Sequence, residues 1–129
     1  MSGDFNRAHV DDDLAKAGPY GSRIAHGLLG TAITTGLLTR DAPEIFGSRV
    51  QGLAFLGIEW RFRAPLLAGD TVHVDWQISG CRVTSAGSSG VVHYTADLVK
   101  TDGTVCQTGT LAMLVKLRTA TTNKEEALT

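Results

Sequence analysis

The longest helical pattern in the chain is IAHGLLGTAITTGL, at residues 24–37. Its apolar residues recur close to every 3.6 positions, as they do on one face of an α-helix. The small residues Gly30, Ala32 and Gly36 lie between them and allow another element to pack closely. The pattern therefore predicts one long helix that lies against a sheet.

Period-two alternation follows this helix and predicts antiparallel strands. Four segments alternate in this way, namely residues 54–62, 72–78, 91–100 and 104–118. Turn-forming residues at 85–90 and at Asp102-Gly103 separate the last three segments. Residues 39–49 break the helical period and predict a loop, whereas residues 11–17 predict a short helix before the long one.

The length of the chain, 129 residues, fits one domain with one core. Helices followed by an antiparallel meander are typical of the α+β class. A long central helix wrapped by a curved sheet suggests the hot-dog architecture. We expect residues 1–118 to form this single hot-dog domain and residues 119–129, which have few apolar residues, to form a mobile tail.

Charge and hydropathy argue against several classes of partner. Twelve Lys and Arg against thirteen Asp and Glu give a formal net charge of −1, so no basic footprint for nucleic acid is expected. No apolar run approaches the roughly 18 residues that span a bilayer. The N-terminus, MSGDFNRAHVDDD, is acidic where a signal peptide is basic and then apolar. We therefore expect a cytoplasmic protein that binds neither nucleic acid nor a membrane.

Cysteine and histidine spacing predicts no disulfide and no metal site. Cys81 and Cys106 form no C-x-x-C pair, and we expect both to be reduced and structural. His73 and His93 fall on the polar faces of predicted strands, with no H-x-x-H or H-E-x-x-H spacing. The chain also has no G-x-S-x-G, P-loop or G-x-G-x-x-G motif, which argues against hydrolase-elbow and nucleotide-binding functions.

Asp4 and His9 are candidates for an acid and base pair. They lie five residues apart in GDFNRAH, residues 3–9, where a loop before the short helix can direct both side chains into one site. A carboxylate beside an imidazole can exchange protons with a substrate. The spacing alone also fits a turn cap and a surface histidine, so the pair needs support from other residues.

Gly27 is a candidate oxyanion site at the start of the long helix. A glycine there allows a ligand carbonyl to approach free backbone N–H groups at the positive end of the helix dipole. The alternative is that Gly27 only permits close packing of helix on sheet and that His26 is a capping or core histidine.

Two segments together resemble a known family. The run SGDFNRAH at residues 2–9, followed after five residues by Ala15, and the run IAHG at residues 24–27 resemble the signature of MaoC-like (R)-specific enoyl-CoA hydratases of the hydratase-2 type. Residues 55–62 and the turn at 69–71 resemble the first long strand of that family and the turn after it. The resemblance extends from Ser2 to Leu117.

The resemblance implies a hot-dog fold, a homodimer, an acyl-CoA substrate and no cofactor. The implied reaction is hydration of a trans-2-enoyl-CoA to the (R)-3-hydroxyacyl-CoA, or the reverse dehydration. Asp4 and His9 would form the catalytic dyad, and the Gly27 amide would hold the thioester oxygen. Which member of the dyad is the acid and which the base stays open, since an ordinary histidine titrates near pH 6.5.

The resemblance also assigns further residues to substrate binding, namely Asn6, His26 and Thr35. Thr35 lies nine residues after His26, where many family members have a serine that helps to order the dyad, and it keeps the hydroxyl.

The chain departs from the family pattern at two points. Arg7 stands where the family has a proline, which changes the rigidity and charge of the loop beside the site. Family members also carry a strand and a helix before the Ser-Gly-Asp segment, so we expect the N-terminal strand of the sheet to be missing here.

Two other functions remain open at this point. A hot-dog thioesterase would use a carboxylate and water on the same kind of ligand, although the Gly-Asp-x-Asn-x-x-His run argues against it. A non-catalytic hot-dog subunit would bind acyl thioesters or complete the site of a partner, which the expected absence of the N-terminal strand favours.

Overall fold

The structure is a computed structural model that describes residues 2–43 and 51–118. The elements in chain order are α1 (Arg7–Val10), α2 (Asp12–Lys16), α3 (Gly27–Asp41), β1 (Gly52–Phe62), β2 (Val72–Val83), β3 (Ser89–Lys100) and β4 (Val105–Lys116). The expected tail at 119–129 and most of the expected loop at 39–49 lie outside the described residues.

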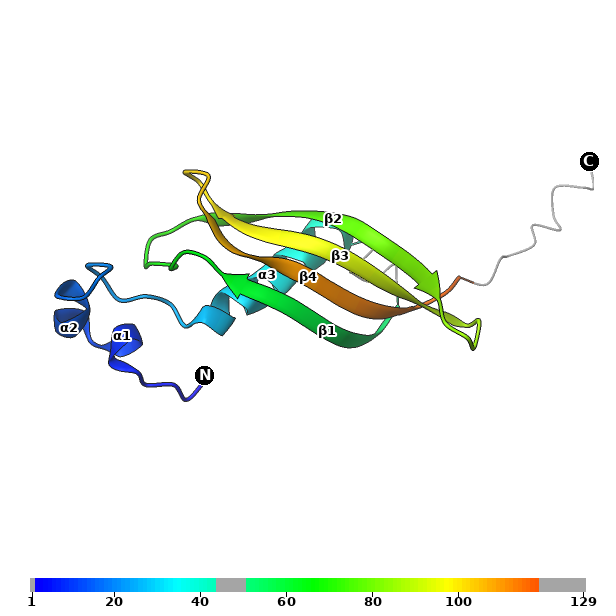
Figure 1. The fold of residues 1–129 in the computed structure, drawn as a ribbon, viewed down its shortest axis with the longest axis horizontal. Helices are drawn as coiled ribbons and strands as arrows, with labels where there is room; N and C mark the ends of the chain where they lie inside the picture. Colours follow the sequence, from blue (N-terminus) through cyan, green and yellow to red (C-terminus); the bar gives the residue numbers. More distant parts are fainter. Residues whose placement is uncertain (1, 44–50, 119–129) are drawn as a thin grey trace, which may run out of the picture.

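Four strands form one curved antiparallel sheet in the order β1-β4-β3-β2 (Figure 1). The strands β2, β3 and β4 are joined as consecutive hairpins, whereas β1 pairs with β4, the last strand in the described residues. The turn predicted at Asp102-Gly103 joins β3 to β4, and Gly103 has a φ of +88°, which favours glycine. The predicted α+β class with an antiparallel sheet is confirmed, but the predicted meander holds only for β2, β3 and β4, because β1 pairs with β4 and not with β2.

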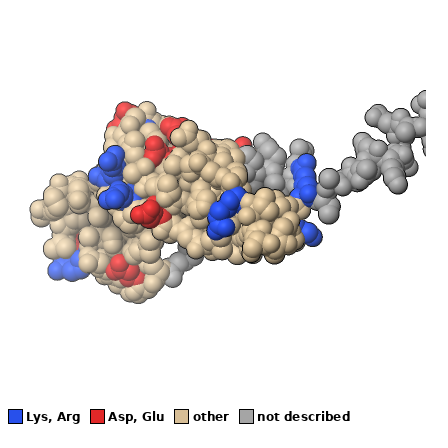
Figure 2. Space-filling view, turned by 45° about the vertical axis from the view of Figure 1, so that its right-hand side comes forward, with Lys and Arg blue, Asp and Glu red and all other residues tan. Residues whose placement is uncertain are grey.

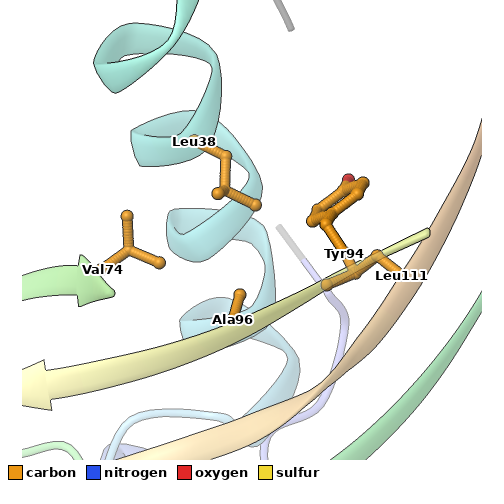
Figure 3. Packing of buried hydrophobic residues seen from close by; sticks show 5 residues of the cluster. All are labelled: Leu38, Val74, Tyr94, Ala96 and Leu111. Atoms are coloured by element: carbon orange, nitrogen blue, oxygen red, sulfur yellow. The ribbon is translucent and has the colours of Figure 1, made fainter. Parts of the chain in front are cut away.

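Helix α3 crosses one face of the sheet, and the main core lies between them (Figure 1). Leu38 of α3 packs against a cluster of strand residues, namely Val74, Tyr94, Ala96 and Leu111 (Figure 3). A second cluster, formed by Leu66, Leu98 and Cys106, lies where the β1–β2 connection meets the sheet. The long helix on a curved sheet is the expected hot-dog arrangement.

The predicted start of the long helix, at Ile24, is wrong by three residues. The Ile24 N–H donates to the Ala8 carbonyl at 3.1 Å, and the Ala25 N–H donates to the Leu66 carbonyl at 2.8 Å. Ile24 also forms an isolated β-bridge with Leu67, and the helix begins only after His26, which caps it. The helix also continues to Asp41 and ends before Pro43, because the residue before a proline disfavours helical backbone.

Three strands are longer than the alternation predicts, whereas β4 is shorter than the expected segment 104–118. β2 continues five residues past Ile78, to Val83, through a register shift between Ile78 and Gly80 that interrupts the apolar pattern. β3 already begins at Ser89, inside the expected turn.

The first helices lie beyond the end of the sheet in Figure 1. His9 belongs to α1, a single helical turn, and not to the loop that the sequence predicts. Asn6 caps this turn, because its side chain accepts from the Ala8 N–H at 3.0 Å. The Ile24–Ala8 hydrogen bond joins α1 to the segment that enters α3.

Strand β1 exposes large apolar side chains along its length. Their exposed fractions are 47% for Leu53, 52% for Phe55, 51% for Leu56, 41% for Ile58 and 55% for Phe62. An edge strand that exposes so many large apolar side chains to water is unusual.

Cys106 is buried, as a structural residue should be, whereas Cys81 is exposed and does not fit the structural role predicted for it. Burial raises the pKa of the Cys106 thiol, so this side chain stays protonated within its apolar cluster. None of the helices in residues 2–43 and 51–118 is long and apolar enough to cross a bilayer. On the face shown in Figure 2, positive and negative side chains are interspersed.

Candidate active site

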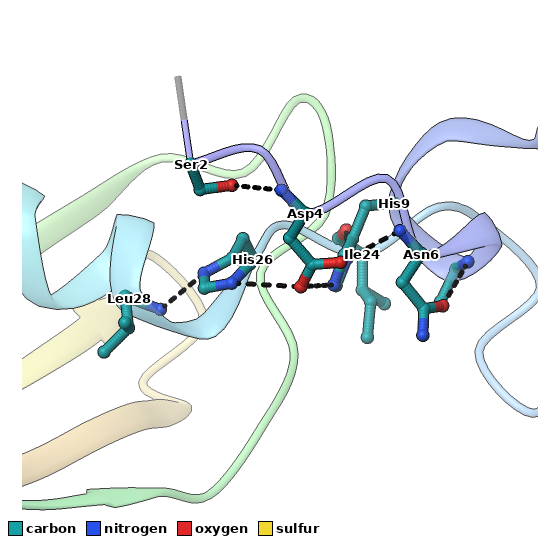
Figure 4. A network of polar contacts seen from close by, with 8 residues as sticks. Ser2, Asp4, Asn6, His9, Ile24, His26 and Leu28 are labelled. Carbon is teal, nitrogen blue, oxygen red and sulfur yellow. Dashed lines mark hydrogen bonds and ion pairs between the residues drawn. The ribbon is translucent and has the colours of Figure 1, made fainter.

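The segment from Ser2 to Asn6 directs one carboxylate oxygen of Asp4 inward. The Asp4 N–H donates to the Ser2 hydroxyl at 3.2 Å, and Oδ1 of Asp4 accepts from the Asn6 N–H at 2.9 Å (Figure 4). This turn occupies Oδ1 and leaves Oδ2 facing two histidines. Asp4 thus meets the imidazoles of His9 and His26.

The hydrogen bond at Nδ1 determines the protonation pattern of His9. Nδ1 lies 2.8 Å from the Ile24 carbonyl oxygen, and a carbonyl can only accept. Nδ1 must therefore carry the hydrogen, so neutral His9 has its lone pair on Nε2. This Nε2 lies 3.8 Å from Oδ2 of Asp4.

His26 has the opposite pattern. Its Nδ1 accepts from the Leu28 N–H at 3.2 Å and so caps α3. Neutral His26 therefore carries its hydrogen on Nε2, which lies 3.2 Å from the same Oδ2 of Asp4 (Figure 4). The two rings lie 5.5 Å apart, and one presents a lone pair to the carboxylate while the other presents an N–H. His26 is thus a capping residue and also a direct neighbour of Asp4.

Two cavities meet at His9. A cavity of about 220 Å³ is lined by His9, Gly27, Phe62, Arg63 and Gln107, among others. A larger one, of about 380 Å³, is lined by His9 together with apolar side chains that include Leu29, Ile33 and Val72. His9, Ile24, Ala25 and Leu66 line both cavities. The imidazole is therefore accessible to a ligand from two sides.

Gly27 is the first residue of α3 and borders the smaller cavity. The first N–H groups of a helix have no partner inside that helix and carry the positive end of its dipole. The structure thus brings the Gly27 backbone to the cavity that His9 also lines.

An ion pair supports the rim of the larger cavity. Lys100 Nζ lies 2.7 Å from Asp70 Oδ2, which also accepts from the Leu67 N–H at 2.8 Å. The Lys100 contact, and then the Leu67 N–H, hold the pKa of Asp70 below its ordinary value, and Asp70 in turn raises the pKa of Lys100. The pair fastens the β1–β2 connection to β3.

Thr35 is not brought to this cluster. Its hydroxyl donates to the Ala32 carbonyl at 2.8 Å, and its side chain lines a separate cavity with Leu38, Phe55 and Tyr94. Nine residues of helix separate it from His26, a rise of about 13 Å. Asn6 lies at the cap of α1, two residues from Asp4.

One polar residue at the site is missed by sequence reasoning. Gln107 of β4 is only 3% exposed and lines the cavity that His9 and Gly27 border. The sequence does hold a signal that Gln107 is buried. Gln107 lies four residues before Leu111, and in a strand this spacing puts it on the same face as the apolar residues of the core. No group of three or more His, Cys, Asp or Glu side chains is arranged to hold a metal among the residues that the structure describes.

The site and fold agree with one family. The chain belongs to the family of MaoC-like domains, which it matches over residues 1–100. Asp4, His9, His26 and Gly27 all lie within this match.

Known proteins with similar sequences and structures include hydratases. The (R)-specific enoyl-CoA hydratase of Rhodospirillum rubrum is 31% identical over 80 residues, which are 62% of this chain and 51% of that protein. The chain spans about half the length of the curated relatives it matches first.

Solved structures confirm the fold. The monoamine oxidase regulatory protein from Archaeoglobus fulgius superposes with a TM-score of 0.79 at 26% identity, over 90% of this chain and 75% of that one. The (R)-hydratase from A. caviae involved in PHA biosynthesis superposes with a TM-score of 0.66 at 25% identity, over 89% and 78%.

Proposed function

We propose that the protein hydrates trans-2-enoyl-CoA to (R)-3-hydroxyacyl-CoA, or catalyses the reverse dehydration. The observation that carries this proposal is the pairing of Asp4 Oδ2 with the lone pair of His9 Nε2, 3.8 Å apart, beside a cavity bordered by Gly27. The names of the hydratases to which the chain is similar support the reaction and its stereochemistry.

The geometry suits activation of one water molecule. A water oxygen can lie about 2.8 Å from both Asp4 Oδ2 and His9 Nε2 and donate one hydrogen to each. His9 then removes a proton from the water as its oxygen attacks C3, and the π electrons of the double bond move toward the thioester oxygen. The imidazolium returns a proton to C2. The Asp4 carboxylate holds the water and stabilises the imidazolium.

The negative charge that develops on the thioester oxygen needs a donor. Gly27 N–H, at the positive end of α3, serves this purpose in the proposed mechanism. The reacting thioester brings its own CoA group, and water is the second substrate, so the reaction needs no further cofactor. The larger apolar cavity at His9 provides room for the acyl chain.

We also propose that the protein is a homodimer. The exposed apolar side chains along the edge strand β1 support this, because a second copy related by a twofold axis covers the same surface on each subunit. Light scattering tests the proposal: a particle of twice the chain mass supports it, and a monomer at micromolar concentration overturns it.

A crotonyl-CoA assay tests the reaction. The purified protein is expected to consume the enoyl absorbance and to form 3-hydroxybutyryl-CoA that an (R)-specific dehydrogenase oxidises. Release of free thiol from crotonyl-CoA or a saturated acyl-CoA would indicate a thioesterase instead. A protein that is inactive alone and gains hydratase activity with a co-purified chain would be a subunit of a mixed complex. The Asp4→Asn variant serves as the negative control.

A further inference from the structure

Gln107 is a buried amide whose hydrogen bonds converge on the start of α3. Its Oε1 accepts from the Trp60 indole N–H at 2.8 Å and from the Thr31 hydroxyl at 3.2 Å. Its Nε2 donates to the Gly27 carbonyl at 2.9 Å. The Trp60 donor identifies which end of the Gln107 amide is the oxygen, since an indole N–H can only donate.

The peptide group between Gly27 and Leu28 is therefore held at both ends. Gln107 binds its carbonyl, and His26 Nδ1 accepts its N–H at 3.2 Å. Nε2 of the same His26 contacts Asp4. A continuous series of polar contacts thus leads from the sheet to the carboxylate of the dyad.

Glycines make room for this arrangement. A Cβ at Gly30 would overlap the Gln107 side-chain amide, so only glycine lets the amide reach the helix. A Cβ at Gly109, opposite Trp60 in the sheet, would overlap the Trp60 ring and the Glu59 carbonyl. Gly30 on the helix and Gly109 on the strand thus leave the space that the Trp60–Gln107–Gly27 contacts need.

We propose that Gln107 is a positioning residue for catalysis. It holds the Gly27–Leu28 peptide, and so fixes the first turn of α3 next to the Gly27 N–H and keeps the proton of His26 on Nε2, toward Asp4. This proposal rests on the proposed hydratase function. Gln107 also lines the cavity, but its fixed contacts are to Trp60, Thr31 and Gly27 of the protein itself.

The test compares Gln107→Leu with Thr108→Val. Both variants remove a hydrogen-bonding side chain from adjacent positions of β4, but Thr108 binds Asp97 and lies away from the site. Gln107→Leu is expected to lower kcat for crotonyl-CoA about tenfold to a hundredfold, as misplacement of catalytic groups does, with KM changed less than about threefold. Thr108→Val is expected to retain the wild-type kcat.

The nitrogen resonances of His26 provide a readout that does not depend on activity. In the wild type, ¹⁵N NMR is expected to show the Nε2–H form, and Gln107→Leu is expected to shift this pattern toward a mixture of tautomers. If the wild type does not hydrate crotonyl-CoA, the proposed function fails while the NMR result still tests the role of Gln107.

Three results would overturn the proposal: an unchanged kcat in Gln107→Leu, an unchanged His26 spectrum, or a fall in kcat that Thr108→Val reproduces. Should Gln107→Leu fail to fold, Trp60→Phe removes only the indole donor and is judged by the same measurements.

Discussion

Asp4 Oδ2 lies 3.2 Å from His26 Nε2, closer than it lies to the other histidine of the site. The carboxylate therefore has a protonated nitrogen on one side and a lone pair on the other. In the proposed mechanism, His26 orients Asp4 and His9 exchanges a proton with the ligand.

Removal of either dyad group should abolish most of the activity. General acid–base groups contribute roughly a hundredfold to ten-thousandfold each, so Asp4→Asn and His9→Ala should lower kcat by about that factor. Asp13→Asn, an exposed aspartate in the first turn of α2, is the matched control. Steady-state assays with thermal melts check this, and near wild-type rates in a folded Asp4→Asn protein would remove Asp4 from the mechanism.

The two roles of His26 can be separated by substitution. Asn also caps helices, but its side chain is too short to cap α3 and contact Asp4 together, so His26→Asn should keep stability while losing about tenfold in rate. His26→Ala should lose the cap as well, at a cost of about 1 kcal/mol in the free energy of unfolding. Chemical denaturation and kinetics on both variants test this, and equal rates in His26→Asn and wild type would contradict it.

Gly27 offers a test of the oxyanion site. A Cβ there would lie 3.0 Å from Cε1 of Phe62, whose side chain is 55% exposed and able to move. Gly27→Val should therefore fold with a nearly normal melting temperature and lose about a hundredfold or more in rate. A lowered melting temperature with a proportionate loss of activity would instead assign Gly27 to packing of helix on sheet.

Two glycines of the same helix should respond in opposite ways to alanine. Gly30→Ala forces the Gln107 amide out of place and should destabilise the protein by about 1–3 kcal/mol. At Gly36 a Cβ meets no atom within 4 Å, so Gly36→Ala should stabilise it by up to about 1 kcal/mol. Urea unfolding of both variants measures the difference, and equal effects would show that Gln107 tolerates the added methyl group.

The Asp70–Lys100 pair should make the free energy of unfolding decrease at acidic pH. Because the folded state lowers the pKa of Asp70 from 3.8, its stabilising effect is present above that pH and is lost as pH falls below it. Asp70→Asn should therefore be less stable than wild type at pH 7, and the difference should shrink toward pH 2. Melting temperatures across this range test it, with Asp75→Asn as an exposed control. A constant difference would contradict the linkage.

A pattern whose apolar face is buried is the easiest to predict, as in the strand around Val74. The helical period also predicts α3, although Leu28, Leu29 and Ile33, which carry that period, are exposed and the helix buries Gly30, Thr34 and Leu38 instead. The predicted helix start is three residues early, because Ile24 continues the apolar period although its N–H binds the carbonyl of Ala8 in α1. The link between His26 and Asp4 is 22 residues long in sequence and depends on side-chain rotamers, so spacing alone does not reveal it.

The hydrogen bond between Gly27 and Gln107 joins residues 80 positions apart. β1 likewise acquires its neighbour in the sheet only from β4. During synthesis, Asp4, His9, His26 and Gly27 therefore leave the ribosome long before β4, whose Gln107 binds the Gly27 carbonyl. A nascent chain that ends at Lys100 already carries these four residues, yet it lacks both the amide that holds the helix start and the partner of β1. The site is complete only when the final strand has emerged and paired.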